Sequence, residues 1–194
     1  MKRESLVPFR IVAIVGSVLF VVISLAPRDA LPKYRYSFLF LVPILWGVLA
    51  VRRRLALRPV PYALFALALA LHDLGAFGFY QRHFVGLQYD WYVHFYFGVV
   101  GGLIVARALH VRFELRGVGL ALFTVLLITG IGGIHEIMEA ASSIFLGPEY
   151  GMLNPGPDNP YDTQEDLLNN VLGSSLGVAL HALALRRRKA DRGE

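Results

Sequence analysis

The sequence contains no cysteine. This absence excludes a disulfide framework, a thiolate metal site and a cysteine nucleophile. The sequence also lacks a glycine-rich phosphate-binding loop and a Gly-x-Ser-x-Gly nucleophile elbow. Any chemistry must therefore come from histidines, carboxylates and hydroxyl groups.

Charged residues are scarce as well. They make up 17% of the 194 residues, whereas hydrophobic residues make up 56%, and the mean hydropathy is +0.54. A soluble domain is usually about one quarter charged. The composition excludes a disordered chain and indicates a membrane protein. We expect a single transmembrane domain that covers residues 1–194.

Six apolar stretches approach the roughly 20 residues that a helix needs to cross a bilayer. The second is short and contains Pro43, and the fifth keeps its apolar helical spacing as far as Phe145. The first begins like a signal peptide, but no good cleavage site follows it, so we expect a retained helix. The sequence thus predicts an all-α, polytopic bundle of six transmembrane helices. Their expected ranges are 7–26, 36–51, 60–80, 91–109, 118–145 and 167–185.

The basic residues favour one side of these stretches. Fifteen of the 19 Lys and Arg residues lie at the N-terminus, in the second and fourth connections and at the C-terminus. The positive-inside rule places these segments, and hence both termini, in the cytoplasm. Topology thus accounts for the basic clusters, and we expect membrane lipids and no nucleic acid as partners.

Under this topology, histidines and acids gather at the outer ends of spans three to six. Residues three or four positions apart share a helix face, and spans four, five and six each carry such pairs of polar residues. Glycines continue the polar stripes of spans four and six, which allows helices to approach closely. We expect these stripes to face the bundle interior. The residues concerned are His72, Asp73, Asp90, His94, His135, Glu136, Glu139, Asp162 and Asp166.

Negative charge dominates this outer half. The outer ends of spans three to six, with their connections, hold nine acidic residues but only one arginine, Arg82. Crowded carboxylates at a membrane boundary repel one another and are costly to desolvate. A divalent metal, protonation or a cationic partner would each offset the charge. Read one at a time, these acids could also be solvated boundary residues, and Asp162 could be a helix cap.

Imidazole and carboxylate ligands without thiolate suit zinc, iron or manganese. We expect a divalent metal, with zinc as the first choice. The candidate catalytic carboxylates are Glu136, as general base on a metal-bound water, and Asp73. This set predicts a metal-dependent hydrolase or transferase that acts on a lipid or cell-envelope substrate. The candidate ligands are His72, His94, His135, Glu139, Asp162 and Asp166.

Two other functions stay open at this point. A proton- or cation-coupled transporter would also place histidines and acids inside the membrane. Against it, spans four and six become glycine-rich and apolar toward the cytoplasm, so no continuous polar path is expected. A non-catalytic subunit of a larger membrane complex would use the polar cluster for helix packing or for binding a partner's basic loop. Whether the protein is an enzyme is therefore left undecided.

The positions of several other residues in the sequence lead to four further expectations. Because His72 lies eight residues before Tyr80, it should sit roughly 12 Å below the outer end. Residues 147–161 should form a proline-rich external loop. His110 and His181 should lie at the cytoplasmic interface. An aromatic belt is expected at the outer boundary, formed by Tyr80, Phe84, Tyr89, Trp91 and Tyr92.

The polar motifs resemble those of the YjdF-like bacterial inner-membrane proteins, an uncharacterised family. The resemblance runs from span two to span six and implies a multi-pass protein of the bacterial inner membrane. The segment from Asp166 to Gly177 is also similar to the final helix of VanZ-like membrane proteins. The motifs that carry the first resemblance are His72-Asp73, Asp90-x-x-x-His94, His135-Glu136-x-x-Glu139 and Asp162-Thr163-Gln164-x-Asp166 with Gly173 and Gly177.

Overall fold

A computed structural model describes residues 5–25, 38–76, 78–150, 160–191 and 193. Over these residues the protein is all-helical, as predicted, apart from a short 3-10 turn, η3 (Phe79–Gln81), and a hairpin of β1 (His83–Phe84) and β2 (Leu87–Gln88). These small elements join α3 to α4. The helices are α1 (Val7–Leu25), α2 (Phe38–Ala50), α3 (Pro59–Ala76), α4 (Tyr89–Phe113), α5 (Gly117–Tyr150) and α6 (Asp162–Ala190).

Among the described residues, four helices are long and apolar enough to cross a membrane. They are α1, α4, α5 and α6. The helices α2 and α3 are apolar but shorter, with 13 and 18 residues. At 1.5 Å per residue they extend about 20 Å and 27 Å, against a hydrocarbon core of about 30 Å.

The helix ends differ from the predicted spans, and two of these differences, in α5 and α3, change the expected loops. The helix α5 includes Phe145, as expected, but it continues beyond that residue to Tyr150. The expected external loop is therefore wrong over residues 147–150, because the helical turns continue without a break from the apolar segment before them. Residues 151–159 lie outside the described residues. The helix α3 ends at Ala76 and not at Tyr80, because the chain turns at Gly78, which has a φ of 87°.

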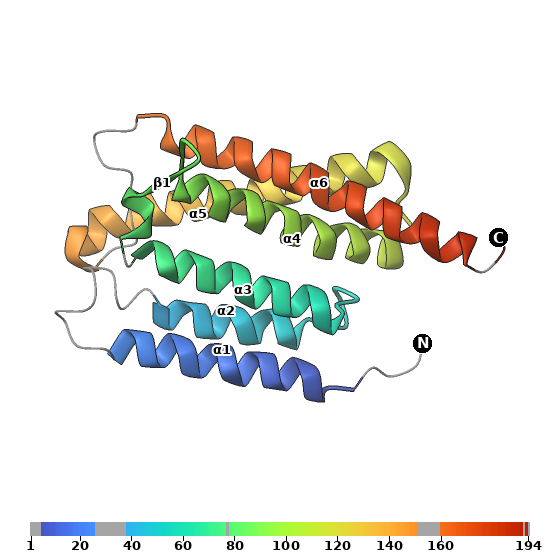
Figure 1. Ribbon diagram of the computed structural model, residues 1–194, viewed down its shortest axis with the longest axis horizontal. Coiled ribbons are helices and arrows are strands. Elements are labelled where there is room, and N and C mark those ends of the chain that lie inside the picture. The colour runs from blue at the N-terminus through green and yellow to red at the C-terminus, as the bar shows by residue number, and fades with distance from the viewer. Residues whose placement is uncertain (1–4, 26–37, 77, 151–159, 192, 194) are drawn as a thin grey trace.

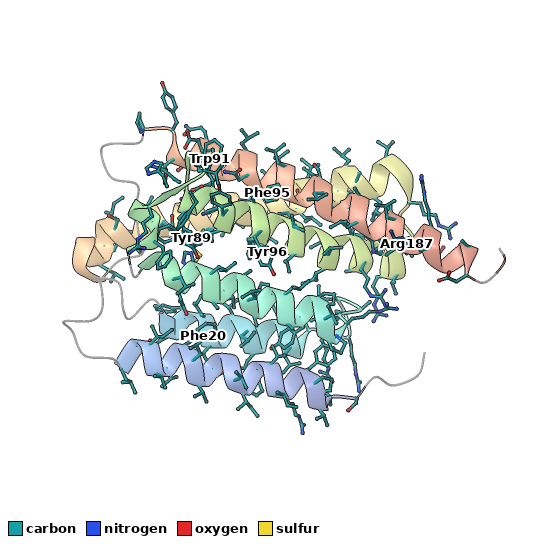
Figure 2. The ribbon with its side chains drawn as sticks, viewed as in Figure 1. Phe20, Tyr89, Trp91, Phe95, Tyr96 and Arg187 are labelled. Atoms are coloured by element: carbon teal, nitrogen blue, oxygen red, sulfur yellow. The ribbon has the colours of Figure 1, made fainter. Side chains whose placement is uncertain are left out.

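The helices α1, α2 and α3 lie side by side and share an apolar core with α4 (Figure 1). Phe20 of α1, Leu45 of α2 and Tyr62 of α3 are each 0% exposed, and Figure 2 shows Phe20 within this layer. The Tyr62 hydroxyl donates a hydrogen bond to the Leu45 carbonyl over 3.0 Å. This layer forms the apolar half of the bundle, and α4 connects it to α5 and α6.

Glycine brings α4 and α6 into direct backbone contact. A Cβ atom on Gly102 of α4 would lie 2.7 Å from the Ser174 carbonyl oxygen of α6. A Cβ atom on Gly173 or Gly177 would overlap a backbone carbonyl of α4. The expectation that these glycines line helix–helix contacts is confirmed. Their spacing lets the two helices run parallel, so their first turns lie at the same end of the bundle.

At the opposite end, polar contacts join the connection between α2 and α3 to the last turns of α4. The Arg107 guanidinium donates to the Ala56 carbonyl over 2.7 Å, and Arg112 donates to the carbonyl of Arg53. The ring centroids of His110 and His181 lie 5.7 Å apart. His181 is only 6% exposed, and its expected position at the cytoplasmic interface stays a prediction. It packs inside the bundle against its partner histidine.

The α4–α6 contact gives a direct test of the fold. We expect Gly173→Ala and Gly177→Ala to lower the free energy of unfolding by about 1–3 kcal/mol, because each new methyl group forces the two backbones apart. The measurement is the thermal unfolding midpoint of the purified protein in detergent. Gly130→Ala is the matched control, because a Cβ atom there meets nothing within 4 Å. Equal midpoints for all three variants would contradict the close packing.

Candidate functional site

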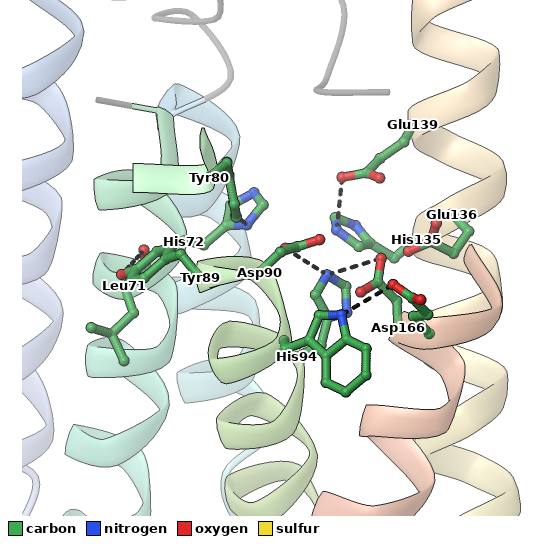
Figure 3. A network of polar contacts seen from close by, with 12 residues as sticks. Leu71, His72, Tyr80, Tyr89, Asp90, His94, His135, Glu136, Glu139 and Asp166 are labelled. Carbon is green, nitrogen blue, oxygen red and sulfur yellow. Dashed lines mark hydrogen bonds and ion pairs between the residues drawn. The ribbon is translucent and has the colours of Figure 1, made fainter. Parts of the chain in front are cut away.

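Polar side chains from α3, α4, α5 and α6 converge at one end of the bundle (Figure 3). We call this the outer end; α4 and α6 begin there, and α3 and α5 end there. The opposite end is the inner end. The convergence brings together residues that lie up to 94 positions apart in the chain. The outer cluster consists of His72, Asp90, His94, His135, Glu136, Glu139, Asp162 and Asp166.

His94 lies at the centre of the cluster, between two carboxylates. Its Nε2 atom is 3.4 Å from Asp90 Oδ1 and 3.6 Å from Asp166 Oδ2. One ligand atom from each of these three residues lies within 4.8 Å of the others. His94 is 7% exposed and Asp166 is 2% exposed. Both distances exceed the 2.7–3.2 Å of a good N–H···O hydrogen bond, whereas Asp90 and Asp166 are close enough to share a side-chain hydrogen bond.

His135 joins this trio to the rest of the cluster. Its Nε2 atom lies 3.1 Å from Glu139 Oε1, one helical turn along α5. Its ring centroid is 6.0 Å from that of His94 and 5.7 Å from that of His72. The three histidines predicted as ligands are therefore neighbours, each supplied by a different helix.

His72 is held by a residue that the sequence analysis assigned elsewhere. The Tyr80 hydroxyl lies 2.5 Å from His72 Nδ1, because the chain folds back after α3 and places the Tyr80 ring against Gly75. The expected depth of His72, roughly 12 Å below Tyr80, is therefore wrong. Loss of contact with water raises the pKa of the Tyr80 phenol well above its ordinary value, and the charges of Asp90 and Glu139 add to this shift.

One carboxylate oxygen of Glu136 accepts a hydrogen bond, and the other does not. Its Oε2 accepts a hydrogen bond of 3.0 Å from Thr163 Oγ1, in the first turn of α6. Its Oε1 is buried and has no hydrogen-bond partner. Asp162 begins α6 and is partly exposed. The charges of Glu136 and Asp162 both act on Asp90 and Asp166, so these two residues belong to the electrostatic surroundings of the trio.

Asp73 differs from the other predicted site residues. It is 1% exposed, and neither carboxylate oxygen has a hydrogen-bond partner. No contact described in the structure connects it to the outer cluster. Along α3 it continues the face of Tyr62 and Leu69, which lie in the apolar core. Its assignment as a catalytic residue stays a prediction that this geometry does not support.

The described ion pairs of Asp90, Glu139 and Asp166 are all with histidines. The one arginine expected nearby, Arg82, instead lies over the Phe79 ring at 4.8 Å from its centroid. The negative charge of the cluster is thus not balanced by Lys or Arg among these pairs. Mutual repulsion of buried carboxylates is costly unless a cation or bound protons offset it.

Aromatic residues surround the cluster instead of forming only a boundary belt. The Tyr89 hydroxyl donates to the Leu71 carbonyl over 2.9 Å, and Trp91 Nε1 donates to Glu165 Oε2 over 3.1 Å. Figure 2 shows both residues in the first turn of α4. Tyr92, in contrast, is 38% exposed, in keeping with a boundary position. The predicted aromatic belt is therefore wrong for Tyr80 and Tyr89, whose side chains turn toward the helices.

Tyr80 and Thr163 are the polar contacts that sequence reasoning did not place in the site. The signal for Tyr80 was Gly75 and Gly78, which mark a chain reversal and a surface on which a ring can pack. The signal for Thr163 was its position one residue after Asp162, in the turn that faces α5.

Comparison with protein families gives a match to the family described as predicted membrane protein (DUF2238), over residues 8–187. No curated protein and no solved structure matches significantly. The resemblance to YjdF-like proteins is confirmed, because these form the same family, whereas the VanZ-like similarity of the last helix has no support. Since the match covers nearly the whole sequence, the chain belongs to this family of predicted membrane proteins (DUF2238).

Proposed function

We propose that the outer cluster binds a divalent metal ion through Asp90, His94 and Asp166. The observation that carries this proposal is the spacing around His94 Nε2, with carboxylate oxygens at 3.4 Å and 3.6 Å. Ligand bonds of about 2.0–2.2 Å in a tetrahedral zinc site imply roughly 3.3 Å between ligand atoms. The three donors therefore stand at nearly the separation that one shared ion requires.

The charge of the cluster supports the same proposal. Asp90, Glu136, Glu139 and Asp166 act on one another through repulsion, and Glu136, Glu139 and Asp166 are each less than 10% exposed. A divalent cation would replace this repulsion with attraction. The nitrogen and oxygen donors, without thiolate, favour zinc and also suit iron or manganese. His72, His135, Glu139 and Asp162 would complete or surround the coordination sphere.

This site would support hydrolysis or group transfer on a lipid or cell-envelope substrate. A bound ion supplies an acidified water molecule and a Lewis acid. Glu136 would accept a proton through its unoccupied Oε1, while Thr163 holds the other oxygen. His135 and Glu139 form a second pair able to exchange protons. The position of the cluster at the helix ends would admit substrates from the membrane surface.

We further propose that all six helices cross the bacterial inner membrane, with both termini in the cytoplasm. The arginine-rich connection between α2 and α3 lies with the last turns of α4 at the inner end, as the positive-inside rule requires. The acidic cluster lies at the other end. The short helices α2 and α3 would span by local thinning of the bilayer. A role as a subunit of a larger complex stays a prediction.

Metal content tests the site. We expect purified protein incubated with zinc and freed of excess ion to retain about one equivalent. His94→Ala and Asp166→Asn should weaken binding at least about tenfold, because each removes a ligand. Elemental analysis after gel filtration measures the bound zinc. His83→Ala and Asp191→Asn are the matched controls, since both residues are exposed and neither makes a described contact with the trio. Zinc-free parent protein would refute the proposal.

Unfolding midpoints measured with and without chelator distinguish a metal site from a cluster of solvated acids. If a metal balances the cluster, Glu139→Gln should lower the unfolding midpoint of zinc-treated protein, and chelator should lower the parent to match. An ion present at 100 times its Kd stabilises the folded protein by about 2.7 kcal/mol. If the acids are only solvated, Glu139→Gln should relieve repulsion, so its midpoint would equal or exceed that of the parent. Chelator would then change neither midpoint.

Reporter fusions test the orientation. Green fluorescent protein fused after Glu194 should fluoresce, because it would fold in the cytoplasm. Alkaline phosphatase inserted at Gly86, in the tip of the hairpin, should be active, because it would lie outside. The reverse pattern would overturn the orientation and would place the acidic cluster at the cytoplasmic face.

A further inference from the structure

An apolar groove lies between α1 and α3, in the layer that contains no part of the trio around His94. Its volume is about 300 Å³, at the lower end of the range of about 300–1,000 Å³ that is typical of ligand pockets. Every side chain that lines the groove is apolar, and the wall formed by α3 consists mainly of alanines. The lining residues include Ile11, Val15 and Leu19 of α1 and Ala63, Ala66 and Ala70 of α3.

The groove is open at the side of the bundle. Ile11 and Val15, on the α1 wall, are 56% and 62% exposed, and α1 is long and apolar enough to cross a membrane. A groove that is left empty in a bilayer would lose dispersion contacts along both of its walls. A helix about 10 Å in diameter occupies roughly 900 Å³ over 12 Å of its length, which is far more than the groove holds. A single hydrocarbon chain is therefore the occupant that fits.

The length and position of the groove match one leaflet of a bilayer. From Ile11 to Phe20 the α1 wall extends roughly 14 Å, and from Ala63 to Ala70 the α3 wall extends roughly 10 Å. One half of the hydrocarbon core is about 15 Å thick. Both helices begin at the inner end of the bundle (Figure 1), and the groove starts one turn after Val7 and Pro59. The first turn thus leaves room for the glycerol backbone of a lipid between the groove and the membrane surface.

Two arginines lie at the end of the groove where the lipid headgroup would be. The Phe9 and Tyr62 ring centroids are 5.6 Å apart, which brings the starts of α1 and α3 together. Arg10 follows Phe9, and Arg58 lies one turn before Tyr62. The Arg58 Nε atom is buried without a hydrogen-bond partner. Ion pairs among the described residues all involve histidines, so neither arginine has an acidic partner there. A guanidinium group binds phosphate oxygens through paired N–H donors.

We propose that this groove binds one anionic phospholipid, with an acyl chain between α1 and α3 and its phosphate group at Arg10 and Arg58. The acyl chain gains little from hydrophobicity, because the surrounding lipid is equally apolar. The shape of the groove therefore fixes the position of the lipid, and the arginines select a negatively charged headgroup. Neither contribution involves the outer cluster, so the lipid site is independent of the proposed metal site.

Lipid affinities measured by native mass spectrometry test the headgroup contacts. The purified protein in detergent is titrated with phosphatidylglycerol and with phosphatidylcholine that carries the same acyl chains. We expect the anionic lipid to bind more tightly, and Arg58→Gln to weaken its binding about fivefold, the effect of one arginine at an anionic surface. Arg187→Gln is the matched control, because it removes the same charge from the last turns of α6, which Figure 2 shows apart from α1. Its affinity should equal that of the parent.

Filling the groove tests the acyl-chain contacts. Ala66→Leu should weaken phosphatidylglycerol binding at least about fivefold, because the added carbon atoms overlap the chain. Ala63→Leu, at the exposed rim, should act in the same way and disturbs the core less. Ala179→Leu is the control, since it makes the same substitution at an exposed position of α6. A phosphatidylglycerol with a photoreactive acyl chain should label α1 and α3 in the parent. Gel filtration and unfolding midpoints verify that each variant is folded.

Four results would overturn the lipid site. They are equal affinities for the two lipids, unchanged binding in the folded leucine variants of the groove, labelling confined to other helices, and a dimer that lipid displaces. Glycerol phosphate that competes as well as the intact lipid would also exclude a role for the groove. All titrations are made with chelator present, so that loss of the proposed metal site cannot imitate any of these results.

Discussion

The glycine-to-backbone contact between α4 and α6 is the constraint on which the outer cluster depends. Gly98 lies one turn after His94, and Gly173 lies two turns after Asp166, so the two helices meet directly below the site. Any side chain at these positions would separate the backbones and carry Asp166 away from His94. Distances of 3.4 Å and 3.6 Å around one imidazole nitrogen tolerate little separation. The proposed chemistry therefore depends on the close packing of small residues between these two helices.

The bundle consists of an apolar layer and a layer that contains most of the buried polar groups. The layer of α1, α2 and α3 buries apolar side chains against one face of α4, and its one buried acid, Asp73, has no partner. The layer of α4, α5 and α6 contains the trio around His94 and most of the unsatisfied polar atoms. Because hydrocarbon offers no hydrogen bonds, such atoms persist only inside a protein interior. The apolar layer thus shields one side of the polar layer from lipid.

Helical spacing in the sequence predicted which residues of a helix share a face. It placed Asp90 with His94 and His135 with Glu139, and the structure shows both pairs. Spacing carries no information on which neighbour a face meets. The return of Tyr80 to His72 required the turn at Gly78, and Asp73 faces a different layer from His72 although the two are adjacent. Tertiary contacts, not local periodicity, decide such positions.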